Sequence, residues 1–115
     1  MRKILLKKTT VLSVFEFKDN EKKLFDKFLL GFVIKDETNR FEKNFRVITS
    51  CIYSQNRFEY TTKSGNSYVT NDEPEKLDIT FAELVMIQDC LYSPSDILQM
   101  RQASQTQRND VRIIH

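Results

Sequence analysis

The chain has 115 residues, of which 40% are hydrophobic and 30% are charged, and its net charge at pH 7 is +2. These values are ordinary for one folded domain spanning 1–115 and leave little room for a second. With two glycines, the sequence has no Gly-rich phosphate-binding loop, and its one histidine, His115, ends the chain, which excludes catalysis by an internal His. We therefore expect a protein that is not an enzyme.

The charges are unevenly distributed along the chain. Residues 1–63 carry 14 basic and 8 acidic side chains, whereas residues 64–96 carry 1 basic and 7 acidic ones. The chain thus combines a basic first half with an acidic later stretch. Such asymmetry is typical of a charged partner surface, and it also arises when opposite charges face each other in a fold or are simply solvated.

The two cysteines, Cys51 and Cys90, lie 39 positions apart, with no C-x-x-C pair and no nearby histidine. No metal site or cofactor is therefore predicted. The apolar stretch at 11–15 is too short for a signal peptide, and no stretch approaches the roughly 18 apolar residues of a membrane span. The sequence predicts a cytoplasmic protein with two reduced, buried thiols.

The first third of the chain predicts a strand, a helix and a second strand. Residues 9–17 are rich in β-branched and aromatic residues with apolar side chains on both faces, which indicates a central strand. Asp19 or Asn20 is expected to cap a helix over 20–30, with Gly31 as its C-cap. The evidence for this helix is a set of apolar residues at helical spacing, namely Leu24, Phe25, Phe28 and Leu29. Residues 32–34 are expected to resume as a strand.

Residues 46–70 predict a three-stranded antiparallel meander. A strand over 46–53 is followed by a turn at Gln55 and Asn56, after which apolar and polar residues alternate to Lys63. A second turn at 64–66 contains Gly65, where positive φ costs little, and 67–70 form the third strand.

The rest of the chain predicts an acidic loop at 71–78 and then helices over 80–92 and 94–103. Thr80 and Glu83 form a capping box for the first helix, while Ser93 and Pro94 start the second. Residues 104–110 are expected to be poorly ordered and 111–115 to dock as a last strand. The fold class is α+β, with a mostly antiparallel sheet of four to six strands, the meander plus N-terminal strands, packed against two to three helices.

Two charged surfaces are candidate binding sites. The acidic loop would attract a basic partner protein and accelerate association through Asp72, Glu73, Glu75 and Asp78. A basic set would contact phosphates, with bases stacked on Phe58, Tyr60 or Tyr68. That set comprises Arg2, Lys3, Lys7, Lys8, Lys22, Lys23 and Lys27. Both surfaces also have a structural interpretation, as solvated charges and buried aromatic rings.

In the absence of a catalytic constellation, the sequence favours a small non-catalytic protein-interaction module. Lone domains of this kind act as inhibitor, immunity-type or adaptor proteins, including those carried by mobile elements or phages. The alternative is a small nucleic-acid-binding domain that uses the basic half of the chain. The sequence leaves the oligomeric state open.

Overall fold

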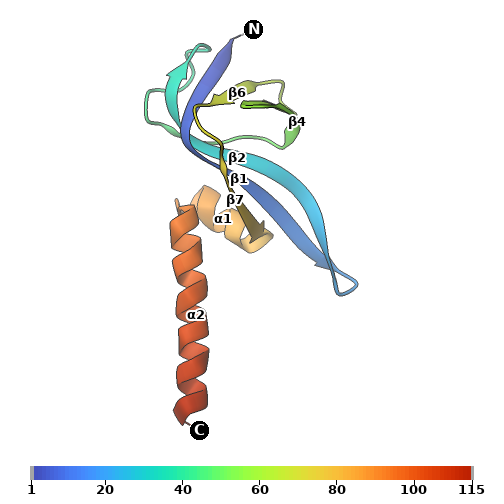
Figure 1. Cartoon of the computed structure of the whole chain (residues 1–115), viewed down its shortest axis with the longest axis vertical. Helices are drawn as coiled ribbons and strands as arrows, with labels where there is room; N and C mark the ends of the chain where they lie inside the picture. The colour runs from blue at the N-terminus through green and yellow to red at the C-terminus, as the bar shows by residue number, and fades with distance from the viewer. Residues whose placement is uncertain (1, 115) are drawn as a thin grey trace. The chain divides into compact units, whose positions relative to one another are not determined.

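The computed structural model describes the backbone of residues 2–114 and the side chains of residues 2–104. It is a small α+β fold with a seven-stranded mixed sheet and two helices (Figure 1). The strands are β1 (Lys3–Lys18), β2 (Glu21–Asp36), β3 (Arg46–Ile48), β4 (Ile52–Asn56), β5 (Glu59–Thr62), β6 (Ser67–Thr70) and β7 (Glu75–Thr80), and the helices are α1 (Phe81–Asp89) and α2 (Pro94–Ile114). Two compact units divide the chain, Met1–Phe81 and Ala82–His115. The predicted class and mostly antiparallel sheet are confirmed, but the strands are more numerous than expected.

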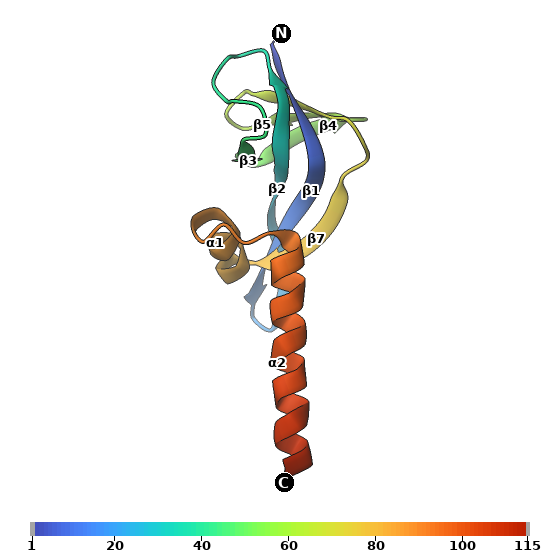
Figure 2. The same cartoon turned by 90° about the vertical axis from the view of Figure 1, so that its left-hand side faces the viewer.

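The long strand β1 organises the first unit. It pairs with antiparallel β2 on one side and, further along, with parallel β7 on the other (Figure 2). Near its start, β1 also pairs with parallel β6. The sheet order is β3-β2-β1-β6-β5-β4, with β7 attached to β1. Because β4 also contacts β2, the sheet curls back on itself. Its core cluster comprises Ile4, Leu6, Val11, Leu29, Val33, Val47, Tyr60 and Tyr68.

The prediction of a helix over 20–30 is wrong, because this stretch is the first part of β2. Asp19 and Asn20 have φ of 56° and 63° and form the tight turn between β1 and β2, in which Lys18 pairs with Glu21. Asp and Asn suit both a helix N-cap and a two-residue hairpin turn with positive φ. The spacing of the apolar residues also suits either structure. Residues 28–31 are buried on successive positions of one strand, so their burial does not alternate as it would in a half-exposed strand.

Gly31 therefore lies inside β2 rather than at a helix end. A Cβ atom at this position would lie 2.9 Å from Thr9 Cγ2 and 3.1 Å from Leu6 Cβ. The register between β1 and β2 shifts here, between Lys7 and Thr10, and Lys8 has a φ of 50°. Glycine thus permits β2 to approach β1 closely at a β-bulge.

The meander is confirmed as β4, β5 and β6, which pair antiparallel in sequence order. The expected strand over 46–53 is interrupted at 49–51, where Thr49 hydrogen-bonds to the backbone of Leu29: Leu29 N donates to Thr49 Oγ1 at 3.0 Å. The prediction of the first turn at Gln55 and Asn56 is wrong, because both residues belong to β4 and the turn falls at Arg57, whose φ is 56°. Gly65 has the positive φ that was predicted, 87°.

The expected acidic loop at 71–78 is only partly a loop, since its second half belongs to β7. In the second unit, Ser93 and Asp96 cap α2 reciprocally: Ser93 N donates to Asp96 Oδ2 at 2.9 Å and Asp96 N donates to Ser93 Oγ at 3.1 Å. The backbone continues as α2 through 104–114, where poor order and a strand were expected, because no Gly or Pro ends the helix. His115 lies outside the described residues.

Within the second unit, a part-buried ion pair joins the two helices. Arg101 on α2 donates from Nη2 to Glu83 Oε1 at 2.7 Å and from Nε to Glu83 Oε2 at 2.8 Å. Glu83 is 9% exposed, so this two-bond contact fixes α1 against α2.

Candidate functional site

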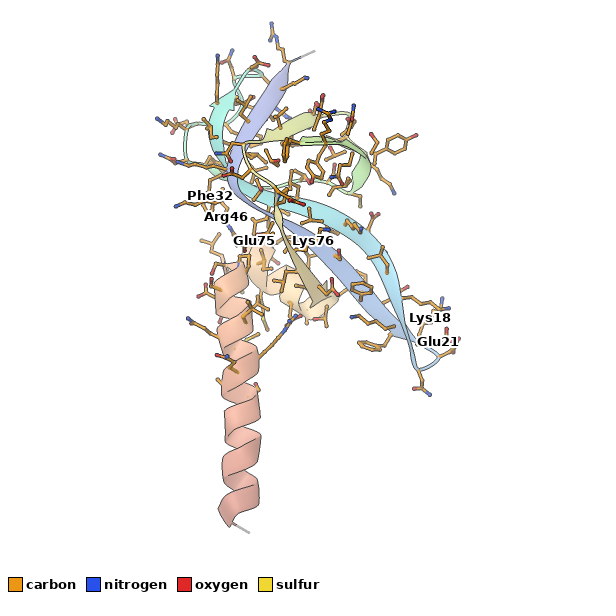
Figure 3. The ribbon with its side chains drawn as sticks, viewed as in Figure 1. Lys18, Glu21, Phe32, Arg46, Glu75 and Lys76 are labelled. Atoms are coloured by element: carbon orange, nitrogen blue, oxygen red, sulfur yellow. The ribbon has the colours of Figure 1, made fainter. Side chains whose placement is uncertain are left out.

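The four predicted acidic site residues all lie on the surface of the first unit, along one segment. We call Asp72, Glu73, Glu75 and Asp78 the acidic segment; all four are exposed. Asp72 and Glu73 precede β7, whereas Glu75 and Asp78 lie within it. Figure 3 places Glu75 at the start of this strand. β7 is an edge strand, since β1 is its one neighbour among the described strands.

Most of the acidic segment has no opposite charge bound to it. Asp72, Glu73 and Glu75 form no ion pair with the described residues, whereas Asp78 Oδ2 lies 3.6 Å from Lys22 Nζ. The three carboxylates line a groove of about 290 Å³ together with Thr9, Thr10 and Lys8, which the β-bulge of β1 contributes. The groove therefore holds three acids and one base.

The seven residues of the predicted basic set do not form one surface. Arg2 and Lys3 lie at the start of β1, Lys7 and Lys8 at its bulge, and Lys22 and Lys23 near the far end of the β1–β2 hairpin. Three of the set are ion-paired: Lys3 with Glu59 at 3.1 Å, Lys22 with Asp78, and Lys23 with Glu21 at 3.9 Å.

The aromatic rings expected to stack bases are mostly inside the fold. Tyr60 and Tyr68 are 2% and 4% exposed and belong to the core, whereas Phe58 is 46% exposed. Burial raises the pKa of the Tyr60 hydroxyl, and the negative charge of Glu73 raises it further. One ring of the three is thus accessible to a ligand.

A larger cleft borders the acidic segment at Glu73. It has a volume of about 520 Å³ and is lined by residues of β1, β2, the β4–β5 hairpin and the approach to β7. The lining residues are Val11, Ser13, Lys27, Ile52, Gln55, Arg57, Phe58, Tyr60, Glu73, Pro74 and Lys76. Of the predicted charged residues, Lys27 and Glu73 meet here, together with two of the predicted aromatic residues, Phe58 and Tyr60. Arg57 and Lys76 were missed, because nothing local in the sequence indicates that β7 pairs parallel to β1.

The two thiols differ. Cys51 is half-buried, and burial raises the pKa of its thiol, as does its hydrogen bond with the carboxylate of Asp26. Cys90 is exposed, because α1 ends at Asp89 rather than continuing to 92. The prediction of two buried thiols is therefore wrong for Cys90, although both are free cysteines.

Comparisons with protein-family models, with curated proteins and with solved structures found no match. Neither helix, as far as its residues are described, has the length and apolar character needed to cross a bilayer. Among the described side chains, no three His, Cys, Asp or Glu residues gather as a group that could hold a metal ion. Two charged features remain as candidate sites, the acidic segment and the neighbouring cleft.

Proposed function

We propose that this protein is a non-catalytic interaction module that binds a basic partner protein through its acidic segment. The observation that carries the proposal is the set of three exposed carboxylates, of Asp72, Glu73 and Glu75, that no described base neutralises. Clustered charge of one sign attracts a partner of the other sign and accelerates its association. A module of this kind serves as an inhibitor, an immunity-type protein or an adaptor.

The position of the acids on the sheet supports the same proposal. They lie beside and within an edge strand, where a partner has access to both side chains and backbone. Charged residues on an edge strand also prevent sheets from pairing edge to edge, which is their purely structural role. The two free thiols fit a reducing compartment, and we place the protein in the cytoplasm.

The alternative, a nucleic-acid-binding domain, predicts the opposite response to these acids. Carboxylates repel phosphates, so their removal should strengthen binding to an oligonucleotide. Three of the seven predicted basic residues are already ion-paired, which leaves the alternative with fewer free cations than the sequence suggested.

Affinity capture with two matched charge variants tests the proposal. Asp72→Lys/Glu75→Lys and the control Glu42→Lys/Asp89→Lys each replace two exposed acids and change the net charge from +2 to +6. We expect wild type and the control to retain one basic protein from host lysate after nuclease treatment, and Asp72→Lys/Glu75→Lys to lose it. Capture that disappears with nuclease, or that both variants retain equally, would contradict the proposal.

A further inference from the structure

The cleft beside the acidic segment has the size of a small-molecule site. Its volume of about 520 Å³ lies within the range of roughly 300–1,000 Å³ that is typical of ligand pockets. Elements distant in sequence form its walls: Val11 and Ser13 of β1, Lys27 of β2, and the β4–β5 hairpin. Because the walls come from paired strands of one sheet, the cleft is largely formed before any ligand arrives.

The charge of this cleft is strongly unbalanced. Lys27, Arg57 and Lys76 contribute three cations from three different elements, while Glu73 contributes one carboxylate. None of these four groups forms an ion pair with the described residues. Two positive charges in excess, gathered around one cavity, favour an anion over a neutral ligand or a cation.

The remaining lining is largely apolar and partly aromatic. Val11, Tyr60 and Pro74 are buried and Ile52 is half-buried, so their contact surfaces are fixed by the fold. Phe58, which follows the turn at Arg57, differs from these residues because 46% of its surface is exposed. An exposed ring beside cations is suited to a flat ring that carries a negative charge.

We propose that the cleft binds a small aromatic anion, a flat ring bearing a phosphate or a carboxylate. Lys27, Arg57 and Lys76 would pair with the anionic group, and Phe58 with the apolar surfaces of the cleft would contact the ring. Phosphate and carboxylate share the chemistry that these cations recognise. This site is separate from the proposed partner surface except at Glu73, and it needs no partner protein.

An NMR titration of the isotope-labelled full chain tests this site. The quantity measured is the change in the amide chemical shifts of the cleft residues as each probe is added. The probes are adenosine 5′-monophosphate, 4-hydroxybenzoate, adenosine and inorganic phosphate. We expect at least one aromatic anion to bind with a dissociation constant of about 1 mM or lower. Adenosine and inorganic phosphate, which lack the charge or the ring, should bind at least tenfold more weakly. The first two probes distinguish a phosphate-bearing ligand from a carboxylate-bearing one.

A pair of charge-matched variants locates the binding. Lys27→Gln/Lys76→Gln removes two cations of the cleft, and the control Lys35→Gln/Lys43→Gln removes two exposed cations outside it. The cleft variant should lose affinity for the aromatic anion by about tenfold, as expected for lost charge-assisted contacts, and the control should bind as wild type does. If the double variant does not fold, Lys76→Gln and Lys35→Gln form the corresponding single pair.

Three results would overturn the site. The first is an absence of shifts in the cleft with both aromatic anions up to about 10 mM. The second is an affinity for adenosine or inorganic phosphate equal to that of the tighter-binding aromatic anion. The third is an equal loss of affinity in the cleft and control variants. Because no protein partner takes part, failure here leaves the proposed function standing, and failure of the capture experiment leaves this site standing.

Discussion

β2 and β7 flank the same strand, β1, and they differ in almost every respect. β2 pairs antiparallel along the whole hairpin and is buried at four successive residues, 28–31. β7 pairs parallel over six residues, of which four are exposed. From this difference we expect that substitutions in β2 reduce the stability of the fold. Substitutions in the acidic segment beside and within β7 should instead reduce binding of the proposed partner.

The largest loss of stability is expected at Asp36, the last residue of β2. Its carboxylate is 8% exposed and accepts hydrogen bonds from the backbone N–H groups of Thr38, Arg40 and Phe41, at 2.7, 2.9 and 2.7 Å. Asp36→Asn removes the charge and one acceptor oxygen, which leaves part-buried backbone donors unpaired. We expect the free energy of unfolding to fall by about 3 kcal/mol in urea titrations at pH 7.

The same residue predicts a pH dependence. Burial alone would raise the pKa of Asp36, but the Thr38 hydroxyl and the three backbone donors outweigh it and lower the pKa below its ordinary value of 3.8. A lowered folded-state pKa stabilises the fold above the unfolded value, and that stabilisation is lost as the pH falls through the folded value. The difference in melting temperature between wild type and Asp36→Asn should therefore shrink below about pH 4. A constant difference from pH 7 to pH 2.5 would contradict this role.

A smaller loss is expected at Gly31, where packing is the cause. The Cβ atom of Gly31→Ala would press on Thr9 and Leu6, both of them buried in β1. Overpacking of this kind costs about 2 kcal/mol, measured by urea unfolding. Unchanged stability would show that β1 and β2 are less closely packed than described.

Gly65 provides the matched contrast, because a Cβ atom there would meet nothing within 4 Å. Its φ of 87° is the constraint instead, and a β-branched residue resists it. Gly65→Val should cost about 1–2 kcal/mol, whereas Gly65→Asn, which tolerates positive φ, should cost less. Equal melting temperatures for wild type, Gly65→Val and Gly65→Asn would contradict the requirement for positive φ at this turn.

The elements that the sequence predicted correctly are those determined by neighbours along the chain. The alternation predicted over 58–63, Gly65 and the Ser93–Pro94 start all act locally. The structure contains the last two and, for the first, the strand Glu59–Thr62, with Phe58 and Lys63 in the flanking turns. β2 was missed because its apolar residues follow helical spacing and its burial has no period-2 pattern: residues 21–25 are exposed, whereas residues 28–31 are buried in succession. Its turn residues, Asp19 and Asn20, were ambiguous because Asp and Asn suit a helix N-cap as well as a hairpin turn with positive φ.

The candidate site shows the same limit. Charge and Pro74 were enough to predict that the acidic residues lie on the surface. The pairing of β7 with β1, however, joins residues that are 65 positions apart, Thr10 with Glu75. The convergence of Arg57, Lys76 and Lys27 on one cleft depends on that pairing, so no local pattern could have predicted it.

On the β7 side, the smallest effect on stability is expected. Asp72→Lys/Glu75→Lys replaces two exposed side chains that form no ion pair with any residue whose side chain the structure describes, so the free energy of unfolding should change by less than about 0.5 kcal/mol. A larger loss, measured by urea unfolding beside Glu42→Lys/Asp89→Lys, would show that the acids have a structural role instead.

The most direct test of the partner surface is the association rate constant of the purified partner with wild type and with the two charge-matched variants, at two salt concentrations. For Asp72→Lys/Glu75→Lys we expect association at low salt to slow by about tenfold or more relative to both other proteins, with less change in dissociation. The wild-type rate should fall toward that of the variant as salt screens the charges. Equal association rates for both variants at low salt would contradict the account.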